Sequence, residues 1–245
     1  MMLSEFSLLP SGPELAGILA AYDWEQLLAR TRGVLAGSGI DDFLLRLDVT
    51  IADGSVRSHW FSTLPGDLAR LFEDKLQGDA DPVNHHIARS GLPLAWTVDQ
   101  LCERGGHAYA ALKRHGIGHG ASFAVRGTLA MSRLDFYRRA ANAEPLSMTL
   151  TGDLLLLGSY LHEAAHALWK KQNPERTPTL TQRERECLYW SAGGKTSKET
   201  AMILGISQHT VYFHLKNVAS KFNVYSTRHA ITRASRMGML TPQML

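Results

Sequence analysis

Apolar residues recur at helical spacing in three short segments near the end of the chain, and glycine or serine separates one segment from the next. Thr196 or Ser197 can cap the second segment, and Ser207 can cap the third after a turn that contains Gly205. A short helix, a tight turn and a longer helix are typical of a helix-turn-helix. The three predicted helices cover residues 184–192, 198–204 and 208–222.

The longer front part of the chain mixes helical and strand-like patterns. Helices that precede, separate and follow the strands predict an antiparallel sheet covered on both faces, an α/β/α sandwich. Asp53-Gly54 predicts the turn of a hairpin. Predicted helices cover 13–36 with a break near Asp23, 64–76, 82–89, 98–115 with a break at Gly105-Gly106, and 152–171; predicted strands cover 43–51, 55–62, 92–97, 116–125 and 128–134.

These patterns predict an α+β protein of two domains. The sandwich takes residues 1–172 and the all-α module, with a fourth helix over 227–237, takes residues 180–245. Residues 173–179 contain two prolines and form the predicted linker.

Charge is unevenly distributed along the 245 residues. Residues 175–245 hold ten Lys/Arg and four Asp/Glu, a balance of +6, and residues 1–174 hold sixteen and nineteen, a balance of −3, which together give +3. A basic module on a mildly acidic body indicates that nucleic acid is contacted at one end.

The two cysteines, Cys102 and Cys187, fall in different predicted domains and show neither metal spacing nor a disulfide framework. We therefore expect a reducing cytoplasm and no cofactor. Residues 1–10 lack the pattern of a secretory signal, and the longest apolar cluster, 154–157, is too short to cross a bilayer, so we expect no membrane.

The predicted helix over 208–222 has an outward face that suits the major groove of DNA. Asp and Glu are absent from residue 208 to residue 245, so no carboxylate repels the phosphates. Side chains that can hydrogen-bond to, stack on or neutralise a duplex are Gln208, His209, Tyr212, Phe213, Lys216 and Lys221.

This segment resembles the LuxR-type DNA-binding domain of bacterial transcription factors. The residues that match the family's motif are Glu184, Leu188, Trp190, Ala192, Gly194, Lys195, Glu199, Ala201, Leu204, Ser207, Thr210, Val211, His214, Leu215, Asn217 and Lys221. The resemblance implies a transcription regulator that binds double-stranded DNA and is not an enzyme.

By analogy with that family, base edges are read by Tyr212, Phe213 and Lys216, and Gln208 can bind adenine through its amide. The candidates for phosphate contacts are Lys195, Thr196, Ser197, Thr210, Asn217, Lys221 and Arg228. The alternative for each lysine is a solvated surface position, and for Thr210 it is a buried helix contact. In the fourth helix, a small apolar stripe indicates self-association, so we expect a homodimer on a pseudo-palindromic operator; the stripe is Ala230, Ile231, Ala234 and Met237.

The front domain resembles the ligand-binding domain of the acyl-homoserine-lactone receptors that carry the same module. The landmarks are Asp81-Pro82, Trp96 and, more weakly, Leu64-Pro65 and Gly120. The resemblance implies that Asp81 accepts a hydrogen bond from the ligand amide and that Trp96 packs on the head group. Asp81 directly before Pro82 also suits the N-cap of a helix, and the two roles can coexist.

Two departures from the family change the expected ligand. The positions where the family has a tryptophan donor and a tyrosine donor are Leu68 and Phe72 here, and neither side chain can donate a hydrogen bond. Each lost donor leaves a ligand carbonyl buried without a hydrogen bond, which weakens the free energy of binding by roughly 1–3 kcal/mol. Either other polar groups (His85, His86, His119, Tyr109 or Ser132) take over, or the signal is a different, more apolar small molecule, which we favour. The predicted ligand-binding residues are Leu68, Phe72, Asp81, Val83, Trp96, Tyr109, Gly120 and Ser132.

A zinc-hydrolase motif also occurs, His162-Glu163-Ala164-Ala165-His166, with its histidines one helical turn apart. Its nearest downstream carboxylate, Glu175, lies in the linker. We therefore interpret this helix as a packing element and expect no metal.

The leading hypothesis is a cytoplasmic, quorum-sensing transcription activator in which a ligand in the front domain shifts the population of DNA-competent dimers. The alternative is a ligand-independent regulator whose front domain binds a protein partner. A phosphorylated receiver domain is disfavoured, because no acidic pair with a lysine follows strand ends in βα alternation.

Overall fold

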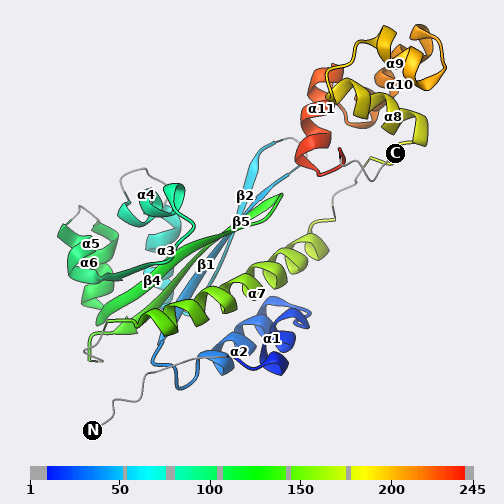
Figure 1. Cartoon of the computed structure of the whole chain (residues 1–245). Helices are drawn as coiled ribbons and strands as arrows, with labels where there is room; N and C mark the ends of the chain where they lie inside the picture. Colours follow the sequence, from blue (N-terminus) through cyan, green and yellow to red (C-terminus); the bar gives the residue numbers. More distant parts are fainter. Residues whose placement is uncertain are drawn as a thin grey trace. The chain divides into compact units, whose positions relative to one another are not determined.

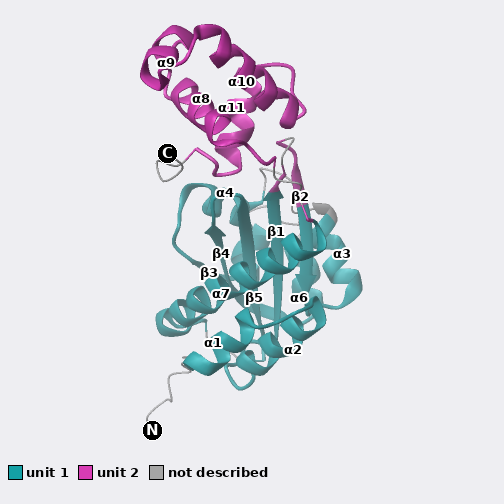
Figure 2. Ribbon diagram, turned by 90° about the vertical axis from the view of Figure 1, so that its right-hand side faces the viewer, with its two compact units in different colours: residues 1–49, 58–173 teal, residues 50–57, 174–245 magenta. Residues whose placement is uncertain are grey.

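A computed structural model of the chain describes residues 10–51, 54–75, 81–103, 107–141, 145–174 and 178–240. The chain divides into two compact units, one of residues 1–49 and 58–173 and one of residues 50–57 and 174–245 (Figure 2). We call the first the sensor unit, after the role that the sequence predicts for it, and the second the helical unit. Among the described residues, no helix is long and apolar enough to cross a membrane.

The sensor unit is built on one five-stranded antiparallel sheet in the order β2-β1-β5-β4-β3. Strand β5 lies at its centre, and Arg133 on β5 pairs with Arg46 on β1 and Ala124 on β4. The strands are β1 (Asp42–Thr50), β2 (Val56–Ser62), β3 (Leu94–Thr97), β4 (Ile117–Arg126) and β5 (Ala130–Arg139).

Helices cover both faces of this sheet (Figure 1). One face carries α1 (Gly12–Leu19), α2 (Trp24–Leu35) and α7 (Met148–Gln172), and the other carries α3 (Gly66–Lys75), α4 (Pro82–Arg89), α5 (Val98–Glu103) and α6 (His107–Arg114). The predicted α/β/α sandwich is confirmed.

Alternation along β5 assigns its side chains to the two layers, because successive side chains of a strand point to opposite faces. Ser132, Leu134 and Phe136 lie on the α7 face, where Ser132 is bonded to His162 of α7. Arg133 and Tyr137 lie on the opposite face, with α3 to α6.

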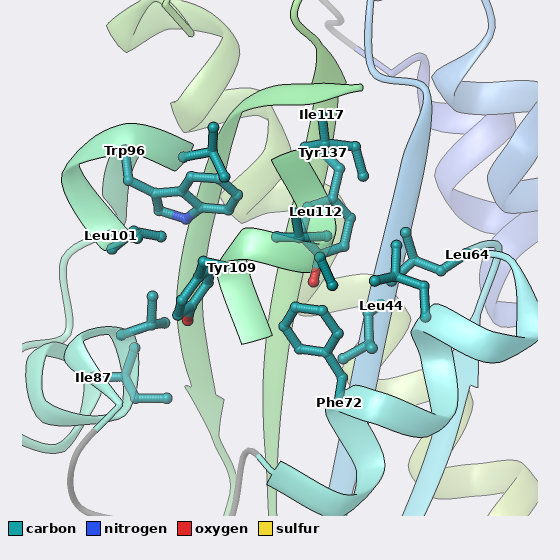
Figure 3. Packing of buried hydrophobic residues seen from close by; sticks show 14 of the residues in the cluster. Leu44, Leu64, Phe72, Ile87, Trp96, Leu101, Tyr109, Leu112, Ile117 and Tyr137 are labelled. Carbon is teal, nitrogen blue, oxygen red and sulfur yellow. The ribbon is translucent and has the colours of Figure 1, made fainter. Parts of the chain in front are cut away.

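That opposite face holds an apolar cluster that includes Leu44, Leu68, Phe72, Trp96 and Tyr137 (Figure 3). On the α7 face, the rings of Phe43, Phe123 and Phe136 stack.

Two elements extend at least four residues beyond one of their predicted ends. Strand β5 continues from residue 134 to Arg139, because Phe136 and Tyr137 are fully buried although charged residues surround them. Helix α7 begins at Met148, four residues early, because the Ser147 hydroxyl caps it. Asp53, Gly105-Gly106 and residues 175–177 of the linker lie outside the described residues, so the predicted turn, break and linker stay predictions.

The helical unit has four helices among its described residues: α8 (Gln182–Ala192), α9 (Ser197–Leu204), α10 (Gln208–Lys221) and α11 (Thr227–Arg236). A Ser or Thr hydroxyl caps each helix N-terminus, which satisfies one otherwise unpaired backbone N–H; the caps are Thr181, Thr196, Ser207 and Ser226. Between α9 and α10, Gly205 has φ +65°, a left-handed conformation that glycine adopts without strain.

Small and branched side chains fix α9 against α10. Cys187, Ala201, Val211 and Leu215 form one buried cluster. Burial raises the pKa of the Cys187 thiol to about 11, so this cysteine packs as an unreactive apolar side chain.

Candidate functional site

A buried cluster of charged side chains lies on the α3–α6 face of the sheet, centred on Arg133. The Arg133 side chain is 2% exposed, and its Nη1 lies 2.8 Å from Asp81 Oδ2 while its Nε lies 2.9 Å from Asp135 Oδ2. The guanidinium therefore bridges a carboxylate from the start of α4 and a carboxylate from its own strand. We call Asp81, Tyr109, Arg133 and Asp135 the ion cluster.

Asp81 receives three hydrogen bonds from within the protein. Its Oδ1 accepts from the Val83 backbone N–H and from the Tyr109 hydroxyl, both at 2.8 Å, and its Oδ2 accepts from Arg133. The bond from Val83 is the helix cap of α4, so the predicted N-cap role of Asp81 is confirmed.

A second chain of hydrogen bonds connects Asp135 to Trp96. The indole N–H of Trp96 donates to Ser122 Oγ at 2.8 Å, and the Ser122 hydroxyl donates to Asp135 Oδ1 at 2.5 Å. The polar edge of Trp96 is therefore already bonded inside the protein.

The neighbouring groups of the ion cluster keep the Arg133 guanidinium protonated. Burial alone lowers the pKa of the guanidinium, but Asp135, followed by Tyr109 and Asp81, raises that pKa well above its ordinary value. Burial, together with Asp81 and Asp135, raises the pKa of the Tyr109 phenol. The Tyr109 hydroxyl therefore stays protonated and donates a hydrogen bond to Asp81.

Predicted pocket residues form the apolar wall beside this cluster. Leu68, Phe72 and Val83 are almost fully buried, and the Phe72 ring packs edge-on against Tyr109 with centroids 6.0 Å apart. Gly120 lies directly under Trp96, because a Cβ there would be 2.2 Å from the indole ring. The structure thus brings together seven of the eight predicted residues: Leu68, Phe72, Asp81, Val83, Trp96, Tyr109 and Gly120.

Tyr137, which sequence reasoning did not single out, adds a hydroxyl to the apolar cluster beside the ion cluster. Its side chain is fully buried, its ring lies 6.3 Å from that of Phe72 and 6.0 Å from that of Trp96, and its oxygen points in among the apolar residues (Figure 3). Among the residues that the structure describes, none is a hydrogen-bond partner of this hydroxyl.

The eighth predicted residue, Ser132, lies on the other face of the sheet. Its hydroxyl is 2.8 Å from His162 Nδ1 of α7, so alternation along β5 separates it from the ion cluster. Of the other polar candidates, His85 is exposed and His86 bonds to the Leu92 carbonyl at 2.8 Å.

The zinc-hydrolase motif forms part of the α7 packing. His162 is bonded to Ser132, and its ring centroid lies 6.0 Å from that of His166. Burial lowers the pKa of both imidazoles. Within the described ranges, no three His, Cys, Asp or Glu side chains come together as metal ligands.

Sequence reasoning missed Arg133, Asp135 and Ser122. One signal was available: Arg133 and Asp135 alternate with Leu134 and Phe136, so they share a face that the apolar pattern did not mark. Only the sheet register shows that this face is buried.

The helical unit presents its predicted DNA-contact side chains to solvent. Tyr212 and Phe213 are each 57% exposed on α10, although both are large and aromatic. Gln208 and Lys216 on α10, Lys195 before α9 and Arg228 on α11 are also exposed, and Ser197 and Asn217 are half-buried.

Three other predicted phosphate ligands have partners inside the unit. Lys221 Nζ lies 2.6 Å from Glu184 Oε2, which ties the end of α10 to α8. The Thr196 hydroxyl donates to Glu199 in the capping box of α9, and the Thr210 hydroxyl lies 2.8 Å from that of Ser207. DNA would have to compete with these bonds.

The apolar stripe of α11 is used inside the unit, which corrects its interpretation as a self-association surface. Ala230 and Ala234 are fully buried in a cluster with Val218 and Phe222, and Ile231 and Met237 pack against it. The stripe exists because α11 needs an apolar face to pack on α10.

Two family models match the chain. Residues 23–165 match the autoinducer binding domain, and residues 178–234 match the bacterial regulatory proteins of the luxR family.

Individual relatives match over most of their length. The transcriptional activator protein AhyR of Aeromonas hydrophila is 27% identical over 216 residues, which cover 85% of this chain and 83% of AhyR. The transcriptional activator protein SolR of Ralstonia nicotianae is 27% identical over 228 residues, which cover 90% of this chain and 94% of SolR. Among solved structures, Escherichia coli SdiA is similar with a TM-score of 0.71 and 26% identity, covering 94% of this chain and 97% of that one.

Proposed function

This chain belongs to the LuxR family of bacterial transcription regulators that carry an autoinducer binding domain, and from that premise we propose that it is a homodimeric, signal-responsive activator that reads a pseudo-palindromic operator with α10. The sensor unit would bind a small molecule, and the chain would act in the cytoplasm, where the DNA is. No residue is proposed to do chemistry on a substrate.

The observation that carries the proposal is the exposed face of α10. Tyr212 and Phe213 lie in water at 57% exposure, which leaves apolar ring surface without a partner in this chain. Lys216 is exposed on the same helix, and the sequence has no carboxylate from residue 208 onward. Such a face gains from a duplex both by stacking and by release of counterions.

Regulation would require the signal to favour the DNA-competent arrangement of the two units in the dimer. A ligand shifts such an equilibrium only by the difference between its affinities for the two states. The buried site beside the ion cluster is where we place that ligand, because large apolar side chains and polar groups converge there.

DNA binding can be tested with a duplex recovered from random-sequence DNA by in vitro selection with the purified chain. The double variant Tyr212→Ala/Lys216→Ala removes two exposed side chains of α10. We expect its affinity for the selected duplex, measured by fluorescence anisotropy, to fall by at least about 10- to 100-fold.

A matched control removes the same two residue types from the sensor unit. Tyr22 is 63% exposed and Lys170 is exposed, so Tyr22→Ala/Lys170→Ala changes area and charge equally while leaving α10 intact. If the α10 variant, folded by circular dichroism, binds as tightly as this control, α10 does not read DNA.

One observation favours a second function, a ligand-independent regulator with a protein partner. The Asp81 carboxylate has its donors from Val83, Tyr109 and Arg133, so it needs none from a ligand. Thermal-shift titration with acyl-homoserine lactones tests the conventional signal: a large stabilisation at micromolar lactone would show that Leu68 and Phe72 do not exclude that class.

A further inference from the structure

The Arg133 guanidinium has no N–H left for a ligand. Its five donors all have acceptors: Nε bonds to Asp135 Oδ2, Nη1 to Asp81 Oδ2 and Asn84 Oδ1, and Nη2 to Asp135 Oδ1 and Tyr109 Oη. Arg133 therefore offsets part of the negative charge of the two carboxylates and cannot also bind a ligand carbonyl or carboxylate without breaking a bond.

Every oxygen of the two carboxylates in the ion cluster already accepts a hydrogen bond. Asp81 accepts from Val83, Tyr109 and Arg133, and Asp135 accepts from Ser122 and Arg133. A ligand N–H would therefore have to share a carboxylate oxygen with a donor that the chain supplies, and in both carboxylates the less occupied oxygen is bonded to the charged Arg133. A ligand amide that stayed unpaired would lose roughly 10- to 100-fold in affinity.

One polar group at the site does lack a partner. The Tyr137 hydroxyl is fully buried, and its oxygen points in among the residues of the apolar cluster (Figure 3). The centroid of the Tyr137 ring lies 6.3 Å from that of the Phe72 ring and 6.0 Å from that of the Trp96 ring. Leu44, Leu64, Leu68 and Leu112 complete the apolar surroundings. A buried hydroxyl without a hydrogen bond is costly, so it indicates an acceptor that the described part of the chain does not supply.

We propose that the sensor unit binds an uncharged, apolar molecule whose one recognised polar group is a hydrogen-bond acceptor, a ketone or ester oxygen, and that the Tyr137 hydroxyl donates to it. This rests on the proposed function of the sensor unit and names the chemical class of its signal. Amide-headed molecules are disfavoured because every carboxylate oxygen of the ion cluster already accepts a hydrogen bond from the chain.

Charge excludes a second class. The ion cluster holds two carboxyl groups against one guanidinium, so a fatty-acid carboxylate would enter a site that already carries excess negative charge. The same chain with a ketone in place of the acid brings the acceptor without that charge.

The test is a thermal-shift and calorimetric titration of the full chain with matched probes: a long-chain methyl ketone, the alkane of the same length, the N-alkyl acetamide of the same length and the corresponding fatty acid. We expect the ketone to bind at least about 10-fold more tightly than each of the other three. Equal or tighter binding of the acetamide or the acid overturns the proposal, as does a ketone dissociation constant weaker than about 1 mM.

The Tyr137→Phe variant separates a ligand contact from a packing role. Without ligand we expect it to be at least as stable as the parent, because it removes a hydroxyl that has no partner. With the ketone we expect about a 10-fold loss of affinity, while the weak affinity for the alkane stays unchanged.

A matched control is Tyr109→Phe, which removes a buried hydroxyl that does have partners. It should lower stability even without ligand. A ligand-free Tyr137→Phe that is destabilised as much as Tyr109→Phe, or that binds ketone as the parent does, contradicts the proposal.

Anisotropy with the selected duplex on the same preparations keeps this inference distinct from the proposed function. A chain that binds DNA but not the ketone overturns only the ligand class. A chain that binds the ketone through Tyr137 but binds no DNA overturns only the regulator.

Discussion

In the sensor unit the charged side chains of Arg133 and Asp135 are buried at the centre of a sheet, whereas in the helical unit Tyr212 and Phe213 are more than half exposed on one helix. Each unit thus reverses the usual placement of polar and apolar groups. In the sensor unit the reversal is balanced by hydrogen bonds within the protein. In the helical unit it is left unbalanced.

The difference indicates what each unit needs from its partner molecule. The exposed aromatic and basic face of α10 is suited to contact a large, negatively charged surface such as that of DNA. The charged groups of the ion cluster are already paired with one another, and beside them the Tyr137 hydroxyl has no hydrogen-bond partner among the described residues.

The most severe test of the comparison is Arg133→Met. It leaves Asp81 and Asp135 buried without their cation, so we expect the sensor unit to lose roughly 3–5 kcal/mol of unfolding free energy. Urea unfolding of the full chain, followed by hydrogen exchange of residues 81–141, measures it.

The control is its register neighbour on β1, Arg46, whose side chain is 20% exposed and paired with Asp48. Arg46→Met should cost clearly less than Arg133→Met, because Arg46 reaches solvent and its loss leaves one carboxylate without its cation and not two. If both variants lost the same unfolding free energy, the buried ion cluster would contribute no more to stability than the Arg46–Asp48 pair.

A smaller loss is expected for Gly120→Ala. The added Cβ would lie 2.2 Å from the Trp96 ring and 2.7 Å from the Phe136 carbonyl oxygen, so the sheet or the indole must shift at a cost of roughly 1–3 kcal/mol. Thermal unfolding measures this. Gly152→Ala on α7 meets nothing within 4 Å and should be neutral or stabilising; a Gly120→Ala protein as stable as that control contradicts the close packing.

In the helical unit, Lys216→Ala and Lys195→Ala should affect DNA binding differently, the first changing sequence specificity and the second changing affinity for any duplex. If Lys216 reads a base edge, its loss costs roughly 1–3 kcal/mol on the selected duplex and little on random DNA. Loss of Lys195 should weaken both duplexes alike and lower the salt dependence by about one ion. Anisotropy over a salt series decides, and identical profiles for the two variants would refute the assignment.

The smallest effect concerns the one buried carboxylate of the helical unit that pairs with a lysine. Burial works against it, but Lys221 and the capping bonds from Thr181 lower the pKa of Glu184 below its ordinary 4.5. The folded unit therefore binds fewer protons than the unfolded chain, so this stabilisation is complete above about pH 4.5 and is lost as the pH falls through the lowered pKa.

Glu184→Gln should cost about 1 kcal/mol at neutral pH, because Lys221 is partly exposed. Hydrogen exchange of residues 178–240 in parent and variant, side by side at each pH, should show the difference disappear in acid. A difference that persists at pH 3 would show that the loss is not electrostatic.

The helical unit was predictable because its determinants are local. Ser207 caps α10 and Gly205 ends α9, as the spacing of these residues in the sequence indicates. The exposed face of α10 also follows from helical periodicity alone. What failed was the stripe of α11, since a sequence pattern does not say whether an apolar face is covered by its own chain or by another.

The sensor site was predictable only in part, because it is assembled by sheet register. Asp81 and Trp96 were found through resemblance and Tyr109 as an alternative polar group, and the three do meet. Arg133 comes from a strand 52 residues after Asp81, and nothing local shows that it turns inward. A choice between Ser132 and Arg133 as the pocket residue depends on strand parity, which one misplaced residue inverts.

Along β5, neighbouring positions have separate tasks: Arg133, Asp135 and Tyr137 lie on the face of the proposed ligand site, while Ser132, Leu134 and Phe136 lie on the face of the long helix α7. Divergence can therefore rewrite the specificity of one side by point substitution while the scaffold on the other is conserved. A single inserted or deleted codon within this strand would exchange the two sets and abolish both tasks at once. In this strand, lineages that acquire new signals should accumulate replacements at alternate codons and tolerate almost no change in length.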